Sequence, residues 1–370
     1  MKRENIKDKI LKQQDITQDE ALFLYNILPV QDLLSLGNEV RFSKIPHRRV
    51  SWQIDRNINY TNVCISACKF CNFHCTLSQK ERSFTTGMEE YKVKIDELLE
   101  AGGNQVLLQG GLHPHYDITF YEELFTALKE YCPSLKLNAL GPPEVSHIAK
   151  MSKLTVKETL IRLRRAGLDS LPGAGAEILS DRVRREISPG KPDAKSWIEV
   201  MEEAHKLGIG TTATMVYGHI ETTEERVGHL FAVRDLQKRK PDGTPGFTAF
   251  IAWPMQVRGT KLERLYHIGK CSPVEHLKMV ALSRIILYNV PHIQVSWLTI
   301  GKELAKLALH SGADDMGSIM MEENVVSSAG ANHRISKEKM IRTIEEAGFR
   351  AWLRNQDYTP YTPHQQEGLA

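Results

Sequence analysis

The chain has 370 residues, of which 48 are Lys or Arg and 45 are Asp or Glu, so its formal net charge is +3. Charged residues make up 25% and apolar residues 41% of the sequence, which is typical of a globular protein and excludes a disordered tail, a collagen-like repeat or a small disulfide-rich module. Basic and acidic residues are interleaved, no apolar run reaches the roughly 18 residues of a membrane span, and the first residues form no apolar signal core. We therefore expect a soluble, cytoplasmic protein without nucleic-acid or membrane partners.

The beginning of the chain predicts a helical extension over residues 1–45. Thr17 and Glu20 have the spacing of a capping box, and a second amphipathic stretch covers Asp32–Phe42. We expect residues 46–355 to form a single barrel domain and residues 356–370 a C-terminal tail. No stretch rich in Pro, Gly or Ser divides the chain, and the most loop-like segment is Lys238–Gly246.

From about residue 50, short apolar strands alternate with longer helical segments. The expected strands are Arg56–Thr61, Gln105–Gln109, Leu135–Leu140, Ser170–Pro172, Thr211–Val216, Thr248–Trp253, Gln294–Leu298 and Met316–Met320. The helical segments between them include Glu89–Ala101, Phe120–Tyr131, Val156–Ala166, Ala194–Leu207, Glu224–Gln237, Val274–Tyr288 and Lys302–His310. Eight such units predict an α/β protein with a closed (β/α)8 barrel of the TIM type, and a doubly wound sheet is the alternative.

Six cysteines carry most of the functional information. Four lie close together and two lie apart: Cys64, Cys68, Cys71, Cys75, Cys132 and Cys271. The first three have the spacing C-x3-C-x2-C directly after the first expected strand, on the barrel face that hosts catalysis. Three thiolates on one loop suit three irons of a 4Fe–4S cluster and leave the fourth iron open to a small molecule.

Cys75 extends this spacing and leaves an alternative open. Four thiolates would suit structural zinc or a closed cluster, although structural zinc sites usually pair two short cysteine knuckles separated by a longer loop. We expect the two isolated cysteines, Cys132 and Cys271, to be buried as small apolar side chains.

The cysteine loop, with the aromatic Phe70 just before its third cysteine, resembles that of radical S-adenosylmethionine enzymes. The resemblance covers roughly residues 45–355. Within this superfamily the chain is most similar to the futalosine-route enzymes of menaquinone biosynthesis, in particular the dehypoxanthine futalosine cyclases. The matching segments are NYTNVCISACKFC, LLQGGLHP, LNALGPPEV, LPGAGAEILSDRVRREISPGK and MEENVVSSAGA. The aminofutalosine synthases share the cysteine loop and are the alternative; the deazaflavin synthases of coenzyme F420 are more distant relatives.

The resemblance implies two cofactors, a 4Fe–4S cluster on Cys64, Cys68 and Cys71 and S-adenosylmethionine on the open iron. In the cyclase family, the 5′-deoxyadenosyl radical removes hydrogen from C4′ of the substrate ribose, and the carbon radical attacks the benzoate ring. Loss of an electron and a proton then gives a spiro-cyclic product. The resemblance also implies a small-molecule substrate, dehypoxanthine futalosine, and an electron donor such as flavodoxin or ferredoxin.

The same resemblance assigns candidate residues for S-adenosylmethionine. Backbone carbonyls of Gln109, Gly110 and Gly111 would take its amino group, although an ordinary strand-to-loop turn has the same pattern. Glu177 would accept hydrogen bonds from its ribose, and the alternative is a solvated glutamate at a helix start. Arg182 is the candidate for its carboxylate, together with Arg184 and Arg185, and the alternative is a solvated helix face.

Histidines and aromatic residues complete the candidate list. His113 and His219 are the candidate catalytic residues, since each follows an expected strand and His can steady a carboxylate or move a proton; His115 lies beside the first. Trp253 and Gln256 are candidate walls for adenine or the aromatic substrate. Each of these residues also has a structural interpretation. The competing function from another class is a non-catalytic metal sensor that uses the four clustered cysteines as a closed site.

Overall fold

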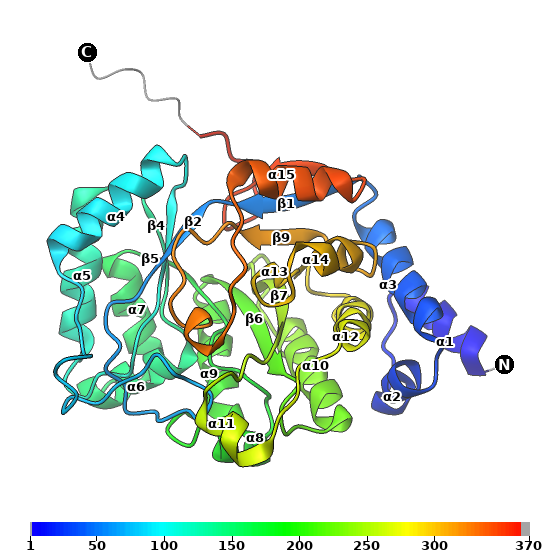
Figure 1. Ribbon diagram of the computed structural model, residues 1–370, viewed down its shortest axis with the longest axis horizontal. Coiled ribbons are helices and arrows are strands. Elements are labelled where there is room, and N and C mark those ends of the chain that lie inside the picture. Colours follow the sequence, from blue (N-terminus) through cyan, green and yellow to red (C-terminus); the bar gives the residue numbers. More distant parts are fainter. Residues whose placement is uncertain (1, 364–370) are drawn as a thin grey trace.

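The computed structural model describes residues 2–363 and shows a barrel of parallel strands surrounded by helices (Figure 1). The strands are β1 (Arg49–Gln53), β2 (Asp55–Ile58), β3 (Gln105–Leu108), β4 (Lys136–Ala139), β5 (Leu168–Leu171), β6 (Gly210–Tyr217), β7 (Phe247–Pro254), β8 (His292–Gln294), β9 (Asp315–Ser318) and β10 (Arg350–Leu353). All ladders between them are parallel, and the order in the sheet is β10-β1-β9-β8-β7-β6-β5-β4-β3-β2.

The sheet closes on itself near the point where β1 leads into the edge strand β2. Beyond β9, the backbone N–H of Ile319 donates to the carbonyl of Gln53 at 3.1 Å, and that of Met321 donates to the carbonyl of Asp55 at 3.2 Å. The chain that follows β9 therefore lies alongside β2, and β2 to β9 surround the interior in sequence order. The (β/α)8 prediction is confirmed. A doubly wound sheet is excluded, because its strand order would reverse at a switch point.

The expected strands overlap the observed ones, with one substantial error and two omissions. The run Gln294–Leu298 is a strand only at its first residue, because Trp297–Ile300 forms the short helix α13. A short apolar run has no periodicity that separates a buried strand from a buried helical turn. The strands β1 and β10, which pair with each other, were not predicted.

Fifteen α-helices are present in the described part of the chain. Their bounds are α1 (Lys2–Leu11), α2 (Gln18–Asn26), α3 (Val30–Lys44), α4 (Met88–Glu100), α5 (Ile118–Tyr131), α6 (Pro142–Ser152), α7 (Val156–Ala166), α8 (Asp181–Ile187), α9 (Ala194–Lys206), α10 (Thr223–Lys238), α11 (Lys261–Tyr266), α12 (Pro273–Ile286), α13, α14 (Lys302–Leu309) and α15 (Lys337–Glu346). A 3-10 helix, η1, covers Ser327–Ala329.

The N-terminal helices α1 to α3 pack on the barrel through α12 and α10, at the right of Figure 1. Thr17 caps α2 in a capping box with Glu20, as the spacing predicts. The expected tail 356–370 lies partly outside the described residues; within them, Arg354 and Pro360 form an isolated bridge after β10.

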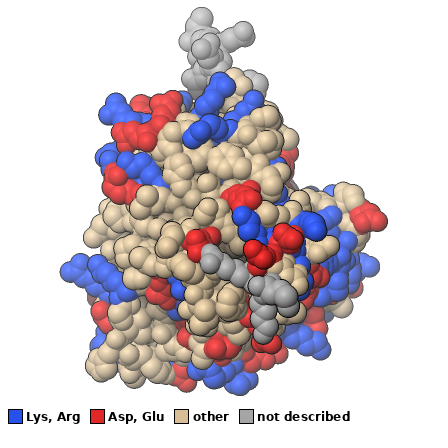
Figure 2. Space-filling view, turned by 90° about the vertical axis from the view of Figure 1, so that its right-hand side faces the viewer, with Lys and Arg blue, Asp and Glu red and all other residues tan. Residues whose placement is uncertain are grey.

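The molecular surface carries mixed charge. On the face shown in Figure 2, basic and acidic side chains alternate without a large area of one sign. No helix within residues 2–363 combines the length and the apolar character that a membrane crossing requires.

Candidate functional site

A cavity of about 330 Å³ lies inside the barrel. One end is lined by Phe70 and Cys71 of the cysteine loop, and Trp253 and Met255 at the end of β7 form an apolar wall. The segment between β9 and α15, orange in Figure 1, adds Val325 and its neighbours. The deeper wall is polar and consists of Gln53, Asp55, Asn57, Asn138, Thr212, Gln294 and Ser318. The cavity therefore joins the cysteine loop to a polar interior.

The amino-terminal end of the barrel is closed by a buried polar network. Arg354 donates to Asp315 at 2.6 Å and to the side-chain oxygen of Gln53 at 2.5 Å. Gln105 donates to Gln356 at 3.1 Å at the same end. A ligand therefore enters from the opposite end, where the cysteine loop lies.

The cysteine loop follows β2 and its thiols share polar contacts. The hydroxyl of Ser66 lies 3.0 Å from Sγ of Cys64 and 3.4 Å from Sγ of Cys68. The backbone N–H of Leu112 donates to Sγ of Cys64 at 3.3 Å. Distant segments fix the loop, since Lys69 N–H donates to Ile187 O at 2.8 Å. The first two thiols thus face one small space.

A glycine next to β3 allows this loop to lie against the barrel. A Cβ on Gly111 would lie 2.1 Å from the carbonyl oxygen of Val63 and 2.9 Å from Cβ of Cys64. Only a residue without a side chain fits there, because such distances are far inside van der Waals contact. A Cβ on Gly110 would likewise lie 2.7 Å from the ring of Tyr60.

The thiol of Cys75 has a hydrogen-bond partner that the other three cysteines do not share. Its thiol is fully buried and donates to Oδ1 of Asn62 at 3.3 Å, while its backbone pairs with Asn62 and Cys64. Four thiolates around one zinc would gather at about 2.3 Å from it, and the described residues include no such group of three or more ligands. A cubic cluster, which places each thiolate on a different iron, fits the spacing of the first three cysteines.

The two isolated cysteines differ from each other. Cys132 is buried at the end of α5, as expected. Cys271 is only half-buried, and its thiol lies near Tyr217 and Glu275, so the prediction of a buried apolar side chain is wrong for this residue. It precedes the N-cap of α12, where polar groups gather.

Glu177 lies in the cavity wall and is 2% exposed. It has a φ of 41° and forms a 2.5 Å ion pair with Lys191. Burial raises the pKa of the Glu177 carboxyl, but the charges of Lys191 and Arg184 outweigh this and hold that pKa below its usual range. The solvated alternative is therefore wrong, because this glutamate is buried, charged and part of the cavity.

Lys191 was not predicted, yet it lines the cavity 5.5 Å from the ring centre of Phe70. It lies in the turn between α8 and α9, and no strand ends there. Two signals in the sequence point to it. The matching segment LPGAGAEILSDRVRREISPGK ends at this lysine, and the ISPGKP turn brings the chain back toward the cysteine loop, where Gly190 N–H donates to Ser66 O at 3.1 Å.

The predicted arginines lie outside the cavity. Arg182 is exposed and binds Glu225 and the carbonyl of Ile220, so its position does not support contact with a ligand there. Arg184 is buried and donates to carbonyls of its own loop, including that of Pro192 at 2.9 Å. Arg185 is exposed. A helix of this length turns successive side chains in different directions, so the cluster in the sequence does not persist in space.

The candidate histidines are also outside the cavity lining. His113 is buried and stacks on Tyr116, with ring centres 3.7 Å apart, and His115 packs beside it. Nε2 of His219 lies 3.0 Å from the carbonyl of Val216 and Nδ1 lies 2.9 Å from Glu221. In contrast, Gln109, Trp253 and Gln256 do line the cavity.

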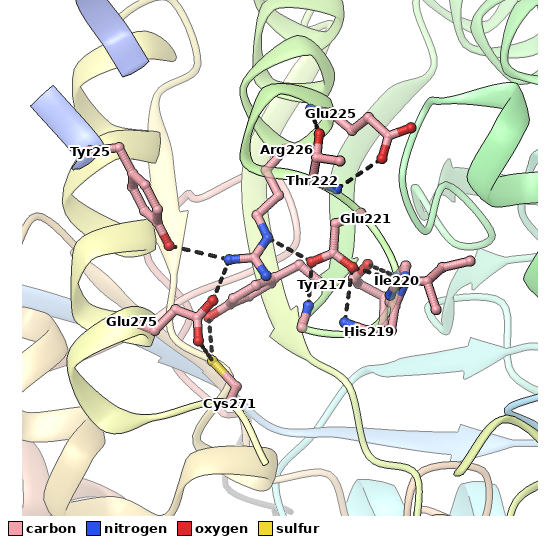
Figure 3. Close-up of polar contacts among 12 residues, drawn as sticks. Tyr25, Tyr217, His219, Ile220, Glu221, Thr222, Glu225, Arg226, Cys271 and Glu275 are labelled. Atoms are coloured by element: carbon pink, nitrogen blue, oxygen red, sulfur yellow. Dashed lines mark hydrogen bonds and ion pairs between the residues drawn. The ribbon is translucent and has the colours of Figure 1, made fainter. Parts of the chain in front are cut away.

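Figure 3 shows the network that holds His219 in place. Glu221 accepts hydrogen bonds from the backbone of Gly218 at 2.6 Å and from Nε of Arg226 at 2.6 Å. Arg226 also binds Glu275 and, at 3.2 Å, the hydroxyl of Tyr25 in α2. The N-terminal extension is thereby tied to the loop after β6.

Comparison with known proteins identifies the family. Residues 58–233 match the radical SAM superfamily and residues 244–367 match the CofH/MqnC C-terminal region. The chain is 44% identical to the cyclic dehypoxanthine futalosine synthase of Streptomyces coelicolor, over 90% of this chain and 82% of that protein. The chain belongs to the radical SAM superfamily. It is therefore an enzyme whose cofactors are a 4Fe–4S cluster and S-adenosylmethionine, as the cysteine loop predicts.

Other relatives cover similar shares of the chain. The cyclic dehypoxanthine futalosine synthase of Halalkalibacterium halodurans is 39% identical, over 94% of this chain and 92% of its own. A 5-amino-6-(D-ribitylamino)uracil–L-tyrosine 4-hydroxyphenyl transferase of Methanosarcina acetivorans is 38% identical, over 90% and 87%. Among solved structures, methylornithine synthase superposes with a TM-score of 0.70 at 20% sequence identity, covering 94% of this chain and 97% of its own. The hydrogenase maturase HydG of Carboxydothermus hydrogenoformans superposes with a TM-score of 0.74 at 17% sequence identity, covering 96% of this chain and 80% of its own.

Proposed function

We propose that the protein cyclises dehypoxanthine futalosine to cyclic dehypoxanthinyl futalosine in menaquinone biosynthesis. The observation that carries the proposal is the similarity to two cyclic dehypoxanthine futalosine synthases, at 44% and 39% identity over nearly the whole chain. The similarity spans both the cysteine loop and the C-terminal region that contributes the segment over the cavity.

The residues of the cavity fit the cofactors of the family. When bound, the cluster and S-adenosylmethionine supply the 5′-deoxyadenosyl radical that removes hydrogen from C4′ of the substrate ribose. Cys64, Cys68 and Cys71 hold three irons, and Cys75 keeps its contact with Asn62 instead.

Lys191 replaces Arg182 as the proposed partner of the methionine carboxylate. It lies in the cavity wall beside Phe70, whereas Arg182 is exposed and already paired. Glu177 accepts hydrogen bonds from the ribose of S-adenosylmethionine, and its ion pair with Lys191 keeps it charged for that contact. The backbone of Gln109, Gly110 and Gly111 takes the amino group.

Apolar side chains of the cavity shield the reacting groups from water. The apolar side chains of Trp253, Met255 and Val325 line the cavity near the cysteine loop and exclude water there. The carboxylate of Glu323 fixes this covering segment, because it accepts hydrogen bonds from the backbone of Val325 at 2.8 Å and of Ser327 at 2.7 Å.

The test is the fate of the adenosyl group. Reduced, reconstituted protein is incubated with S-adenosylmethionine and dehypoxanthine futalosine carrying deuterium at C4′. We expect deuterium in free 5′-deoxyadenosine and a cyclised product that has lost two hydrogens. A parallel incubation replaces dehypoxanthine futalosine with an enolpyruvyl benzoate. An adduct of the adenosyl group with that compound, and no turnover of dehypoxanthine futalosine, would assign the aminofutalosine synthase reaction and overturn the proposal.

A second candidate function follows from the relatives named as 5-amino-6-(D-ribitylamino)uracil–L-tyrosine 4-hydroxyphenyl transferases. The sequence identity of this chain to the Methanosarcina acetivorans transferase is 38%, close to its identity to the cyclic dehypoxanthine futalosine synthases. Incubation with tyrosine and 5-amino-6-(D-ribitylamino)uracil under the same conditions decides between the two. Turnover of that pair alone would assign the transferase reaction.

A further inference from the structure

One row of side chains crosses the polar wall of the cavity. In the parallel register of β2, β3 and β4, Asn57 pairs with Leu107, which pairs with Asn138, and all three residues line the cavity. They therefore point to the same side of the sheet at one depth in the barrel. The row consists of two amides separated by one apolar side chain.

The side-chain oxygen of Asn57 lacks a hydrogen-bond partner. The residue is 4% exposed, and its Oδ1 contacts no donor in the part of the chain that the structure describes. A buried amide oxygen is stabilised only when a donor satisfies it. Because this amide lies in the cavity wall, the natural source of that donor is a bound molecule.

Asn138 presents the complementary group. Its Oδ1 accepts a hydrogen bond from the hydroxyl of Ser170 at 2.8 Å, so its amide nitrogen is the group left for a ligand. Of the hydroxyls beside it, that of Thr214 donates to Gly173 O at 2.6 Å and that of Thr212 accepts from Gly173 N–H at 3.1 Å. The row thus offers a ligand an acceptor on β2 and a donor on β4, on the two sides of Leu107.

We propose that Asn57 and Asn138 bind hydroxyl groups of the five-carbon sugar portion of the substrate. A hydroxyl both donates and accepts, so two hydroxyls of one sugar satisfy an amide oxygen and an amide nitrogen together. A carboxylate accepts only and would face the Asn57 oxygen. The polar wall contains no Lys or Arg that could bind an anion. Its carboxyl group, Asp55, accepts hydrogen bonds from Ser318 and from Gln53 at 3.2 Å.

A five-carbon sugar alcohol is part of the name of the transferase relatives, which supports sugar hydroxyls as the ligand groups. The hydroxyl contacts therefore do not depend on which reaction the enzyme catalyses; the identification of the sugar as the ribosyl part of dehypoxanthine futalosine rests on the proposed function.

The test measures binding of dehypoxanthine futalosine to anaerobic, cluster-loaded protein by equilibrium dialysis, in the presence of S-adenosylmethionine and without reductant. Asn57→Leu removes the acceptor, and Asn138→Asp keeps the contact with Ser170 while removing the donor. We expect each variant to weaken binding about tenfold with unchanged affinity for S-adenosylmethionine. Asn289→Leu is the control, because its Oδ1 is also without a partner but lies outside the cavity lining.

Each result supports or overturns the inference. Unchanged binding in both variants overturns it, as does a loss of S-adenosylmethionine affinity, which would assign the amides to that cofactor. Asn57→Ala is read in the same way if Asn57→Leu fails to load its cluster. If only 5-amino-6-(D-ribitylamino)uracil binds, and the variants weaken it, the proposed function fails while the sugar contact stands. If neither compound binds the unmodified protein, both fail.

Discussion

The thiol of Cys75 donates to the side-chain oxygen of Asn62 across 3.3 Å, although this cysteine follows Cys71 with the spacing of a fourth ligand. The thiol of Cys75 thus has a partner of its own, whereas those of Cys64 and Cys68 share the hydroxyl of Ser66. This division gives the first prediction.

Replacement of Cys64, Cys68 or Cys71 by Ala should abolish cluster binding, because a three-thiolate site has no spare ligand. Cys75→Ala should retain about the full iron and sulfide content after anaerobic reconstitution. Iron and sulfide analysis with visible absorbance spectra measures both. Equal loss of iron in all four variants would show that Cys75 is a ligand and that no iron is open.

Gly111→Ala should also prevent cluster binding, although it changes no ligand. The added Cβ would lie 2.1 Å from the carbonyl oxygen of Val63 and would displace the cysteine loop. Gly228→Ala in α10 is the matched control, because nothing lies within 4 Å of its added Cβ and alanine favours a helix. The same iron analysis tests both; normal iron content in Gly111→Ala would mean that the loop shifts without loss of its function.

Lys191→Met should weaken S-adenosylmethionine binding tenfold to a hundredfold, the effect of losing a charge-assisted contact of about 1.5–3 kcal/mol. It should also destabilise the fold, since a buried charge left without its partner costs about 3–5 kcal/mol. Glu177→Gln in the same chain should restore the melting temperature without restoring the affinity. Lys195→Met, an 83% exposed lysine on α9, is the control. Unchanged affinity in Lys191→Met would remove this residue from the cofactor site.

Glu221 should make stability depend on acid pH. Burial raises its pKa, but the contacts with His219 and Arg226 outweigh this and lower it to about 2. A carboxyl with a lowered pKa in the folded state stabilises the protein above its unfolded pKa, near 4.5, and loses this contribution as the pH falls toward 2. The contribution is about 3 kcal/mol.

The comparison with Glu221→Gln measures this contribution. The melting temperature of the unmodified protein should exceed that of the variant by a few degrees at pH 7, and the difference should shrink below pH 4.5. A difference that stays constant down to pH 3 would show that the carboxylate charge has no part in it. The neighbouring Glu224→Gln, on the exposed start of α10, should show only a small difference.

The sequence predicted the barrel because alternation of strands and helices is a local property repeated along the chain. Prediction from the sequence failed where the position of a residue depends on contacts with residues far away in the chain. The strand β10 follows α15 and pairs with β1, which lies about 300 residues earlier (Arg49 opposite Arg350). Neither is a continuous apolar run, because Arg49 and Arg350 are exposed and the rest of β10 is only half-buried.

The same limit applies to the candidate site. The three candidate cysteine ligands share one loop, and their spacing alone was enough to single them out. Lys191 enters the cavity because the turn after α8 folds back onto the cysteine loop, which no local pattern shows. Asn57 faces inward on β2 among polar neighbours, so its burial contradicts the ordinary rule that polar strand positions face water.

The partners of the cysteine loop determine when the cluster site comes into existence. The loop is held by Ile187, by Leu262, whose N–H donates to Lys69 O at 2.8 Å, and by the carbonyl of Ser328, which accepts from Asn72 at 3.0 Å. During synthesis, a chain that has emerged only as far as its cysteines lacks every one of these anchors. The loop therefore acquires all of these contacts only after residues as far as Ser328 have been made.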